Sequence, residues 1–255
     1  MDNTLEVRGV SLRFGGVRAL TDVSFSVKDG ELFSIIGPNG AGKTSIVNCI
    51  SGRYRPTEGQ LFYRGRDITA LNPNARASLG IGRTFQNLAL FRTMTVWQNI
   101  MLGGHCRTRS GFLANALRLP WVQREEETLE DHAGQLVDLL DLRAVAGAQV
   151  MDLPFGTQKR VELARALAAQ PRLLLLDEPA GGLNHEEVGT LMELLRQVRE
   201  RLGLTMLLVE HHMNLVMRVS DQVVALDFGR VIADGSPAQV QADADVIRAY
   251  LGGRG

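Results

Sequence analysis

The sequence predicts an α/β fold in which helices cover a mostly parallel sheet. Compact apolar runs alternate with helix-like stretches along the C-terminal part of the chain. The runs are residues 173–176, 205–209 and 223–226, and the helix-like stretches are residues 186–201 and 213–219. Strands without polar interruption are typical of a parallel sheet that is buried on both faces. Between about residues 93 and 169 strand signals vanish and apolar residues recur at helical spacing, which indicates an inserted helical subdomain.

The N-terminal part has a different pattern. Residues 5–36 read as short strands with turn punctuation at Gly15-Gly16 and Asp29-Gly30, and residues 58–68 read as another strand pair. Together they predict an antiparallel β subdomain. An apolar run at 32–36 leads into a Gly-rich loop and a helix at 43–50, and further helices are expected at 125–142 and 158–168. We therefore expect one core, residues 1–88 and 168–255, with the helical subdomain at about 89–167.

The composition is that of an ordinary globular protein. The 255 residues are 45% hydrophobic and 22% charged, and 28 basic side chains balance 28 acidic ones, which argues against a nucleic-acid binder. Cys49 and Cys106 match no metal or disulfide spacing, so a reducing compartment is the simpler interpretation. The N-terminus does not resemble a secretory signal, and no apolar stretch approaches the roughly 20 residues of a membrane span. We expect a cytoplasmic protein that reaches a membrane only through a partner.

The Gly-rich loop carries the strongest motif. Residues 37–44 read G-x-x-x-x-G-K-T after a predicted strand and before a predicted helix. The glycines let consecutive backbone N–H groups face nucleotide phosphates at a helix N-terminus. Lys43 adds a full charge, and the Thr44 hydroxyl is placed to bind Mg²⁺. A Gly-rich turn without function is the alternative, but such a turn needs no Lys-Thr pair, so we expect a P-loop NTPase core.

Two carboxylates follow a later strand. Asp177 and Glu178 come directly after four leucines, and a buried parallel strand delivers them to the sheet edge where ligands gather. Asp177 would hold Mg²⁺, directly or through water, and Glu178 would polarise the attacking water. Acidic residues often end strands without any function. Their occurrence together with the phosphate loop predicts a nucleotide hydrolase.

Further motifs resemble those of ATP-binding cassette (ABC) transporter ATPases, in family order over residues 5–252. Phe14 resembles the aromatic residue that stacks on adenine, and Gln86 the glutamine that contacts Mg²⁺ and senses the membrane subunit. Residues 153–160 occupy the place of the signature loop, and residues 181–184 that of a loop at the dimer interface. His211 resembles the switch histidine, with His212 beside it as a rival.

The residues and the resemblance together assign a site for ATP and Mg²⁺. The catalytic residues are Glu178 and His211, and the metal ligands are Thr44, Gln86 and Asp177. The nucleotide-binding residues are Phe14, Gly37, Pro38, Asn39, Gly40, Ala41, Gly42, Lys43, Thr44, Ser45, Gln86, Pro154 and Gly156.

The signature loop departs from the family pattern Leu-Ser-Gly-Gly-Gln. Pro154 stands in place of the serine, Phe155 replaces the first glycine, and Thr157 replaces the glutamine, while Gly156 is retained. Proline is compatible with a helix start. The resemblance therefore implies a loop that contacts the partner subunit's ATP through backbone N–H groups and lacks one hydroxyl contact.

The finer resemblance is to one ATPase subunit of branched-chain amino acid importers, carried by residues 80–87, 91–96, 177–184, 210–213 and 246–252. It implies two permease subunits, a second, related ATPase and an external solute-binding protein as partners, at the cytoplasmic face of the membrane. Importers of urea or amides and the ATPase of lipopolysaccharide export are alternatives of the same class. A weakly hydrolytic regulatory cassette and a non-transport cassette are alternatives of other classes. The non-transport cassette needs a coiled coil or a second cassette, which 255 residues do not provide.

Overall fold

The structure of the chain is a computed structural model that describes residues 3–84, 89–105 and 120–251. Contacts divide the chain into two compact units, residues 1–86 with 172–255 and residues 87–171. The predicted insertion at about 89–167 falls inside the second unit. Within the described ranges, none of the helices combines the length and the apolar character that crossing a bilayer requires.

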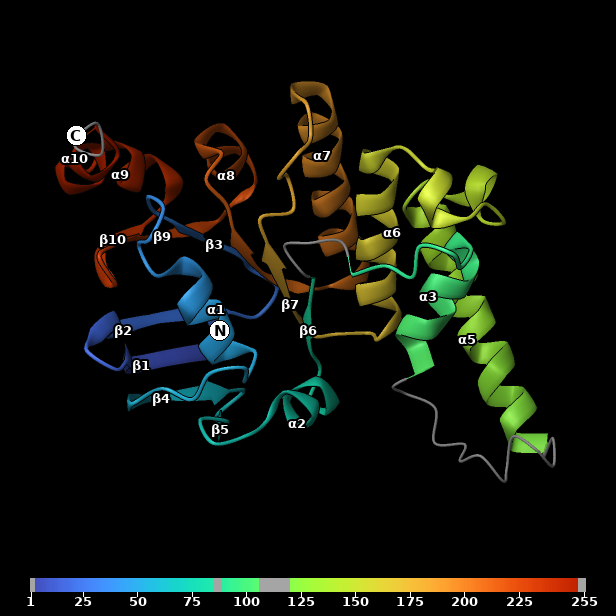
Figure 1. Cartoon of the computed structure of the whole chain (residues 1–255), viewed down its shortest axis with the longest axis horizontal. Helices are drawn as coiled ribbons and strands as arrows, with labels where there is room; N and C mark the ends of the chain where they lie inside the picture. Colours follow the sequence, from blue (N-terminus) through green and yellow to red (C-terminus); the bar gives the residue numbers. More distant parts are fainter. Residues whose placement is uncertain (1–2, 85–88, 106–119, 252–255) are drawn as a thin grey trace. The chain divides into compact units, whose positions relative to one another are not determined.

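The first unit begins with an antiparallel sheet (Figure 1). Its strands lie in the order β2-β1-β4-β5 and are β1 (Asn3–Phe14), β2 (Val17–Lys28), β4 (Glu58–Tyr63) and β5 (Arg66–Asp67). The predicted antiparallel subdomain is confirmed, but β1 and β2 are 12 residues each rather than short. Register shifts interrupt their pairing, one of them between Val7 and Val10, where Gly9 adopts φ +61°. These bulges let a long strand pair bend without breaking.

The second sheet of this unit is mostly parallel, as predicted. Its order is β10-β9-β3-β8-β7-β6, and only the edge strand β10 runs antiparallel to its neighbour. The strands are β3 (Leu32–Ile36), β6 (Ile81–Arg83), β7 (Leu173–Asp177), β8 (Thr205–Val209), β9 (Gln222–Asp227) and β10 (Arg230–Gly235). Strands β3, β7 and β8 are buried at every residue, which explains their predominantly apolar sequences.

Helices link these strands. They are α1 (Lys43–Ile50), α2 (Pro73–Ser78), α7 (His185–Leu202), α8 (Met213–Val219), α9 (Pro237–Ala242) and α10 (Ala244–Leu251). Helix α7 begins with a capping box: the Asn184 side chain accepts from the amides of Glu186 and Glu187, and the Glu187 carboxylate accepts from the Asn184 amide. The helix ends at Gly203, which adopts φ +59°.

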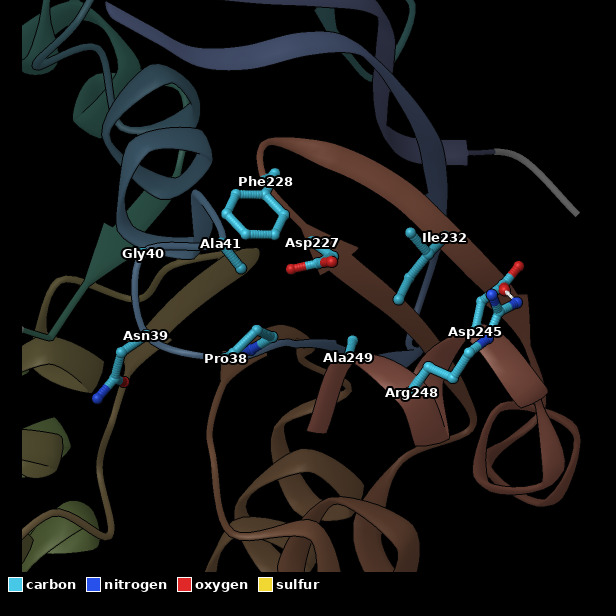
Figure 2. Close-up of a pocket in the computed structure, with 10 residues that line it drawn as sticks. All are labelled: Pro38, Asn39, Gly40, Ala41, Asp227, Phe228, Ile232, Asp245, Arg248 and Ala249. Atoms are coloured by element: carbon cyan, nitrogen blue, oxygen red, sulfur yellow. Dashed lines mark hydrogen bonds and ion pairs between the residues drawn. The ribbon is translucent and has the colours of Figure 1, made fainter. Parts of the chain in front are cut away.

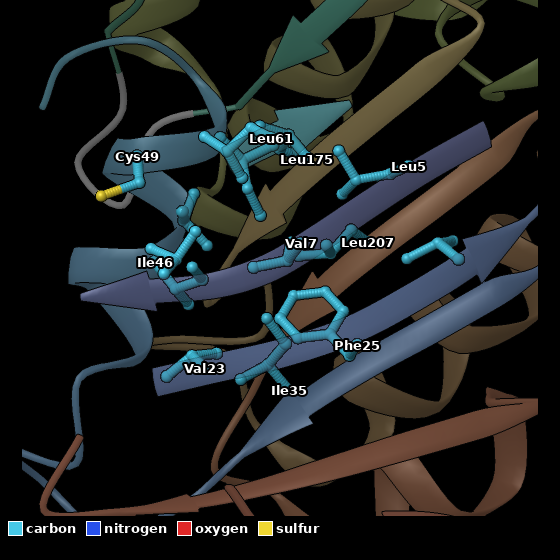
Figure 3. Packing of buried hydrophobic residues seen from close by; sticks show 14 of the residues in the cluster. Leu5, Val7, Val23, Phe25, Ile35, Ile46, Cys49, Leu61, Leu175 and Leu207 are labelled. Atoms are coloured by element: carbon cyan, nitrogen blue, oxygen red, sulfur yellow. The ribbon is translucent and has the colours of Figure 1, made fainter. Parts of the chain in front are cut away.

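One hydrophobic core joins helix α1 to both sheets. Figure 3 shows Ile46 of α1 beside Val7 and Phe25 of the antiparallel sheet and Leu175 and Leu207 of the parallel sheet. Because side chains alternate along a strand, only every second residue of β7 and β8 enters this core. The core therefore fixes the start of α1, and with it the loop before α1, against the ends of the parallel strands.

The second unit is helical. Helices α3 (Val96–Gly104), α5 (Pro120–Leu139) and α6 (Phe155–Ala168) pack against one another, with short 3₁₀ turns at Arg143–Val145 and Val150–Asp152. A Cβ at Gly103 would lie 2.1 Å from the Arg165 carbonyl oxygen, so glycine permits the close approach of α3 to α6. Helix α5 starts and ends earlier than predicted, since proline suits its first turn and Asp141 adopts φ +51° just after it.

Candidate functional site

The phosphate loop connects β3 to α1 in the first unit. Gly37, Gly40 and Gly42 all adopt positive φ, of +147°, +83° and +102°. A Cβ at Gly37 would lie 2.2 Å from the carbonyl oxygen of Leu226, and the loop conformation therefore requires glycine at that position. No side chain caps α1 at Gly42, so its first amides are directed to the loop without a side-chain acceptor.

Lys43 is folded onto its own loop. The ammonium donates to the carbonyl oxygens of Gly37, at 2.7 Å, and Pro38, at 2.9 Å, and the side chain is buried. Burial lowers the pKa of Lys43, while the nearby carboxylates of Glu178, Asp177 and Glu210 act in the opposite direction. Thr44 is exposed and Ser45 is half-buried at the start of the same helix. The structure thus brings Lys43 into the field of the carboxylates that follow β7 and β8.

Asp177 ends β7 and is 2% exposed. Its Oδ2 accepts from Arg83 at 2.7 Å, whereas Oδ1 is buried and has no hydrogen-bond partner within the described residues. A buried carboxylate oxygen without a donor is suited to a cation or to a water bound by one. Oδ1 of Asp177 and the hydroxyl of the exposed Thr44 are oxygen donors of the kind that Mg²⁺ prefers.

Glu178 follows at a strained position. Its φ is +49°, a conformation that is uncommon for a residue with a Cβ, and its amide donates to the carbonyl of Val209 at the end of β8. Such backbone strain clusters at functional sites, where the surrounding structure maintains it. The side chain is half-buried. Glu178 therefore occupies a fixed place beside Asp177 at the carboxyl ends of the strands.

The histidine segment after β8 is organised by Glu210. This fully buried carboxylate accepts from the Ala180 amide at 2.9 Å and from the His212 ring Nδ1 at 3.0 Å. The His211 ring Nδ1 lies 3.7 Å from the same carboxylate, and the two imidazoles are 4.3 Å apart. His212 is thus held through one ring nitrogen, and the His211 ring is less tightly held and more exposed. Glu210 was predicted only as part of the motif at residues 210–213, and its anchoring role was not predicted.

The remaining residues that were predicted to bind nucleotide differ in their exposure to solvent. Phe14 ends β1 with a ring that is 47% exposed and contacts Tyr54 edge-on at 5.1 Å between centroids, so it is not a core aromatic. Asn39 and Gly40 are exposed, Pro38 is half-buried and Ala41 is buried. Gln86 lies outside the described residues.

The predicted signature loop lies in the second unit. Pro154 is the N-cap residue of α6, with φ −55° and ψ 149°, and no side chain caps this helix. Gly156 is half-buried in the first turn. The Thr157 hydroxyl accepts from Arg160 at 3.3 Å, and the Phe155 ring is exposed. The loop therefore offers an anion the backbone N–H groups of a helix start.

A pocket of about 510 Å³ lies on another side of the phosphate loop. Figure 2 shows that Pro38–Ala41 line one part of it and that Asp245, Arg248 and Ala249 of α10 line another. Lys43, Thr44, Asp177 and Glu178 are absent from its lining, so this pocket is separate from the two carboxylates at the end of β7. The same tail helix reaches the loop directly, because the Gly37 amide donates to the Tyr250 hydroxyl at 2.9 Å.

Comparisons with known proteins agree with this geometry. Residues 20–181 match the family model described as ABC transporter, and residues 230–255 match one described as branched-chain amino acid ATP-binding cassette transporter. The chain is 40% identical over 248 residues to the high-affinity branched-chain amino acid transport ATP-binding protein LivG of Salmonella typhimurium and to BraF of Pseudomonas aeruginosa. The match covers 97% of this chain and of each relative.

Solved structures show the same fold. The ADP conformation of MJ1267, an ATP-binding cassette of an ABC transporter, superposes with a TM-score of 0.86 at 30% identity, over 99% of both chains. A dimeric post-hydrolysis state of the ATP-binding cassette MJ0796, bound to ADP and Pi, gives 0.75 at 26% identity, over 91% of this chain and 98% of that one. The chain therefore belongs to the ABC transporter family, as an ATP-binding and ATP-hydrolysing subunit.

Proposed function

We propose that this chain powers an importer of branched-chain amino acids from the cytoplasmic face of a membrane, bound to permease subunits. The observation that carries the substrate class is the tail. Residues 230–255 match the branched-chain amino acid cassette model, and relatives named for branched-chain amino acid transport align along nearly the whole chain. Amino acids are recognised by the pore and by an external binding protein in this proposal, so the contribution of this chain is ATP hydrolysis.

The phosphates of ATP would lie across the start of α1. The first amides of α1 point there without a side-chain cap, and the helix dipole favours negative charge. On binding, Lys43 would exchange the carbonyls of Gly37 and Pro38 for phosphate oxygens. The exposed ring of Phe14 would stack on the adenine.

Mg²⁺ would be held by the Thr44 hydroxyl and by Oδ1 of Asp177, with Gln86 as a further ligand by resemblance. The buried, unpartnered Oδ1 supports this assignment. When bound, the ion would neutralise the charge that develops on the phosphates during hydrolysis.

Glu178 would orient the water that attacks the terminal phosphate and accept its proton. Its position beside Asp177, fixed by the bond from its amide to Val209, supports this role. His211 would donate a hydrogen bond to the same phosphate, because its ring is less tightly held than that of His212. Glu210 would keep the segment in place through its bond from Ala180.

A second cassette would complete each ATP site. The relative MJ0796 forms a dimer with ADP and Pi. In such a pairing, the Pro154 and Gly156 turn of this chain would contact the ATP held by its partner. The uncapped start of α6 supports contact through backbone N–H groups.

Transport in a reconstituted system tests the proposal. The chain is assembled with the permease subunits, second cassette and binding protein of its transporter, and ATP-dependent uptake of radiolabelled leucine, isoleucine and valine is measured in proteoliposomes. We expect uptake that excess unlabelled leucine suppresses and that Lys43→Ala in this chain reduces. Uptake of urea or an amide in place of leucine would overturn the substrate class. Full transport with Lys43→Ala would indicate a regulatory cassette instead.

A further inference from the structure

Arg83 joins three elements of the first unit through one guanidinium. It ends β6, and its side chain is 10% exposed. Nη2 donates to Oδ2 of Asp177 on β7 at 2.7 Å. Nη1 donates to Oδ1 of Asn48 at 2.7 Å and to Oγ of Ser51 at 2.9 Å, at the end of α1. The same helix begins with Lys43, so one side chain connects the phosphate-binding helix to the carboxylate at the end of β7.

The contact with Asp177 uses only one carboxylate oxygen. Arginine commonly pairs with a carboxylate through two parallel hydrogen bonds, which would cover both oxygens. Here Nη1 is committed to Asn48 and Ser51, and Nε has no partner within the described residues. The guanidinium therefore cannot rotate to donate to Oδ1 of Asp177 without losing its hydrogen bonds to Asn48 and Ser51. Oδ1 of Asp177 therefore stays buried and has no donor among the residues that the structure describes.

We propose that Arg83 is a positioning residue that holds Asp177 by Oδ2 so that Oδ1 is presented to Mg²⁺. This inference rests on the metal role proposed above for Asp177. Partners behind a metal ligand orient it, and their loss typically lowers metal affinity by about 10- to 100-fold. Arg83 reaches the metal only through Asp177.

The charges around Asp177 determine whether removal of Arg83 raises or lowers the affinity for the metal ion. Without Arg83, Oδ2 becomes a buried oxygen that has lost its donor, and such a carboxylate turns to another cation. Lys43 is a cation that interacts with Asp177 electrostatically. A carboxylate drawn towards Lys43 no longer offers a fixed oxygen to the ion. Removal of Arg83 should therefore weaken metal binding even though it removes a positive charge.

Metal binding can be measured without turnover. Purified Arg83→Met, Arg83→Lys and wild-type chains are titrated with Mn²⁺ in the presence of the non-hydrolysable analogue AMP-PNP, and free Mn²⁺ is followed by its paramagnetic resonance spectrum. We expect Arg83→Met to raise the metal dissociation constant about 10-fold or more. Arg83→Lys, which keeps the charge but loses the fork, should recover part of the affinity. Nucleotide affinity in EDTA should change less than about twofold, since Arg83 has no contact with the loop amides.

Arg76 provides the matched control. Its guanidinium is also buried at the end of α1, where it donates to the carbonyls of Cys49 and Ile50, but it does not contact Asp177. Arg76→Met should lower the unfolding temperature and leave Mn²⁺ affinity unchanged in the folded fraction. Ser51→Ala is a milder second variant that should shift Mn²⁺ affinity in the same direction as Arg83→Met.

The outcomes separate this inference from the proposed function. If Asp177→Asn changes metal affinity and Arg83→Met does not, Arg83 has no positioning role. Loss of nucleotide affinity in EDTA to the same extent as metal affinity would show that Arg83 only supports the fold of the loop. If Asp177→Asn leaves metal affinity unchanged, the metal assignment itself is wrong.

Discussion

Replacing Pro154 by serine restores the residue type that the family pattern has at this position. Pro154 is the N-cap residue of α6, and its φ of −55° and ψ of 149° are open to serine. Serine is among the best N-cap residues, because its oxygen accepts from an amide of the first turn. The same hydroxyl has a hydrogen to donate, so it can cap the helix and still contact a phosphate. The substitution adds a donor without changing the backbone.

The substitution has two separate effects, one on the free energy of unfolding and one on the hydrogen bond to the partner's phosphate. A serine cap adds about 0.5–2 kcal/mol of stability, and loss of the proline costs about 0.4–1 kcal/mol by loosening the unfolded chain. The unfolding temperature should therefore change little. A hydrogen bond to a charged group contributes about 1.5–3 kcal/mol, which corresponds to about a 10- to 100-fold effect. The Thr157 hydroxyl accepts from Arg160 and keeps its own hydrogen to donate, so a contact from Thr157 to the phosphate would reduce this effect.

The assay must report which ATP site gains activity. Hydrolysis is measured in the assembled transporter while the phosphate-loop lysine of each cassette is replaced in turn. We expect Pro154→Ser to raise hydrolysis at the site whose phosphate loop belongs to the partner, and to leave the site of Lys43 unchanged. An increase at the Lys43 site would refute the head-to-tail assignment. Equal activity at both sites before and after the change would show that backbone N–H groups alone suffice.

Three further predictions concern the hydrolysis of ATP, the geometry of the phosphate loop and the contact with the permease. Glu178→Gln should keep ATP affinity and reduce turnover by about 10²–10⁴-fold, which rapid-quench measurements of phosphate release would check, and wild-type turnover would remove Glu178 from the mechanism. Gly37→Ala should abolish nucleotide binding, because its Cβ would lie 2.2 Å from the Leu226 carbonyl oxygen, whereas Gly40→Ala, with open space around it, should only weaken binding in fluorescence titrations. Similar affinities of these two variants would contradict the geometric reasoning. A Phe91→Cys variant should crosslink to the permease, since this aromatic is 50% exposed instead of filling the helical unit, and the absence of crosslinks at residues 89–96 would exclude this docking surface.

The sequence predicted the elements whose signals are local. Helix α1 and strand β8 have the predicted bounds, because a Gly-rich loop precedes the first and a continuous apolar run defines the second. The family prediction is confirmed for the same reason, since its motifs are short and contiguous. The predicted strand 173–176 is one residue longer in the structure and includes Asp177.

Features that depend on distant contacts were missed. Strand β6 has three residues, too few for any periodicity, and it exists because it pairs with β7 about 90 residues later. Arg83 was therefore predicted only as part of the motif at residues 80–87, although its partners Asn48, Ser51 and Asp177 are 35, 32 and 94 residues away along the chain. The contact of Tyr250 with Gly37 spans 213 residues. Such roles arise from the topology of the sheet and leave no local pattern.

The charged groups of the site are paired with one another or with the backbone, and this has a consequence for nucleotide affinity. Arg83 pairs with Asp177, and Lys43 satisfies two of its hydrogens on the carbonyls of its own loop. Glu210 is paired with backbone amides and with His212. An incoming phosphate must displace the loop carbonyls from Lys43, so the lysine contributes only the difference between a phosphate oxygen and a carbonyl oxygen. The amides at the start of α1 have no side-chain acceptor to lose, and the structure therefore assigns them a larger share of the net binding free energy than their lack of formal charge suggests.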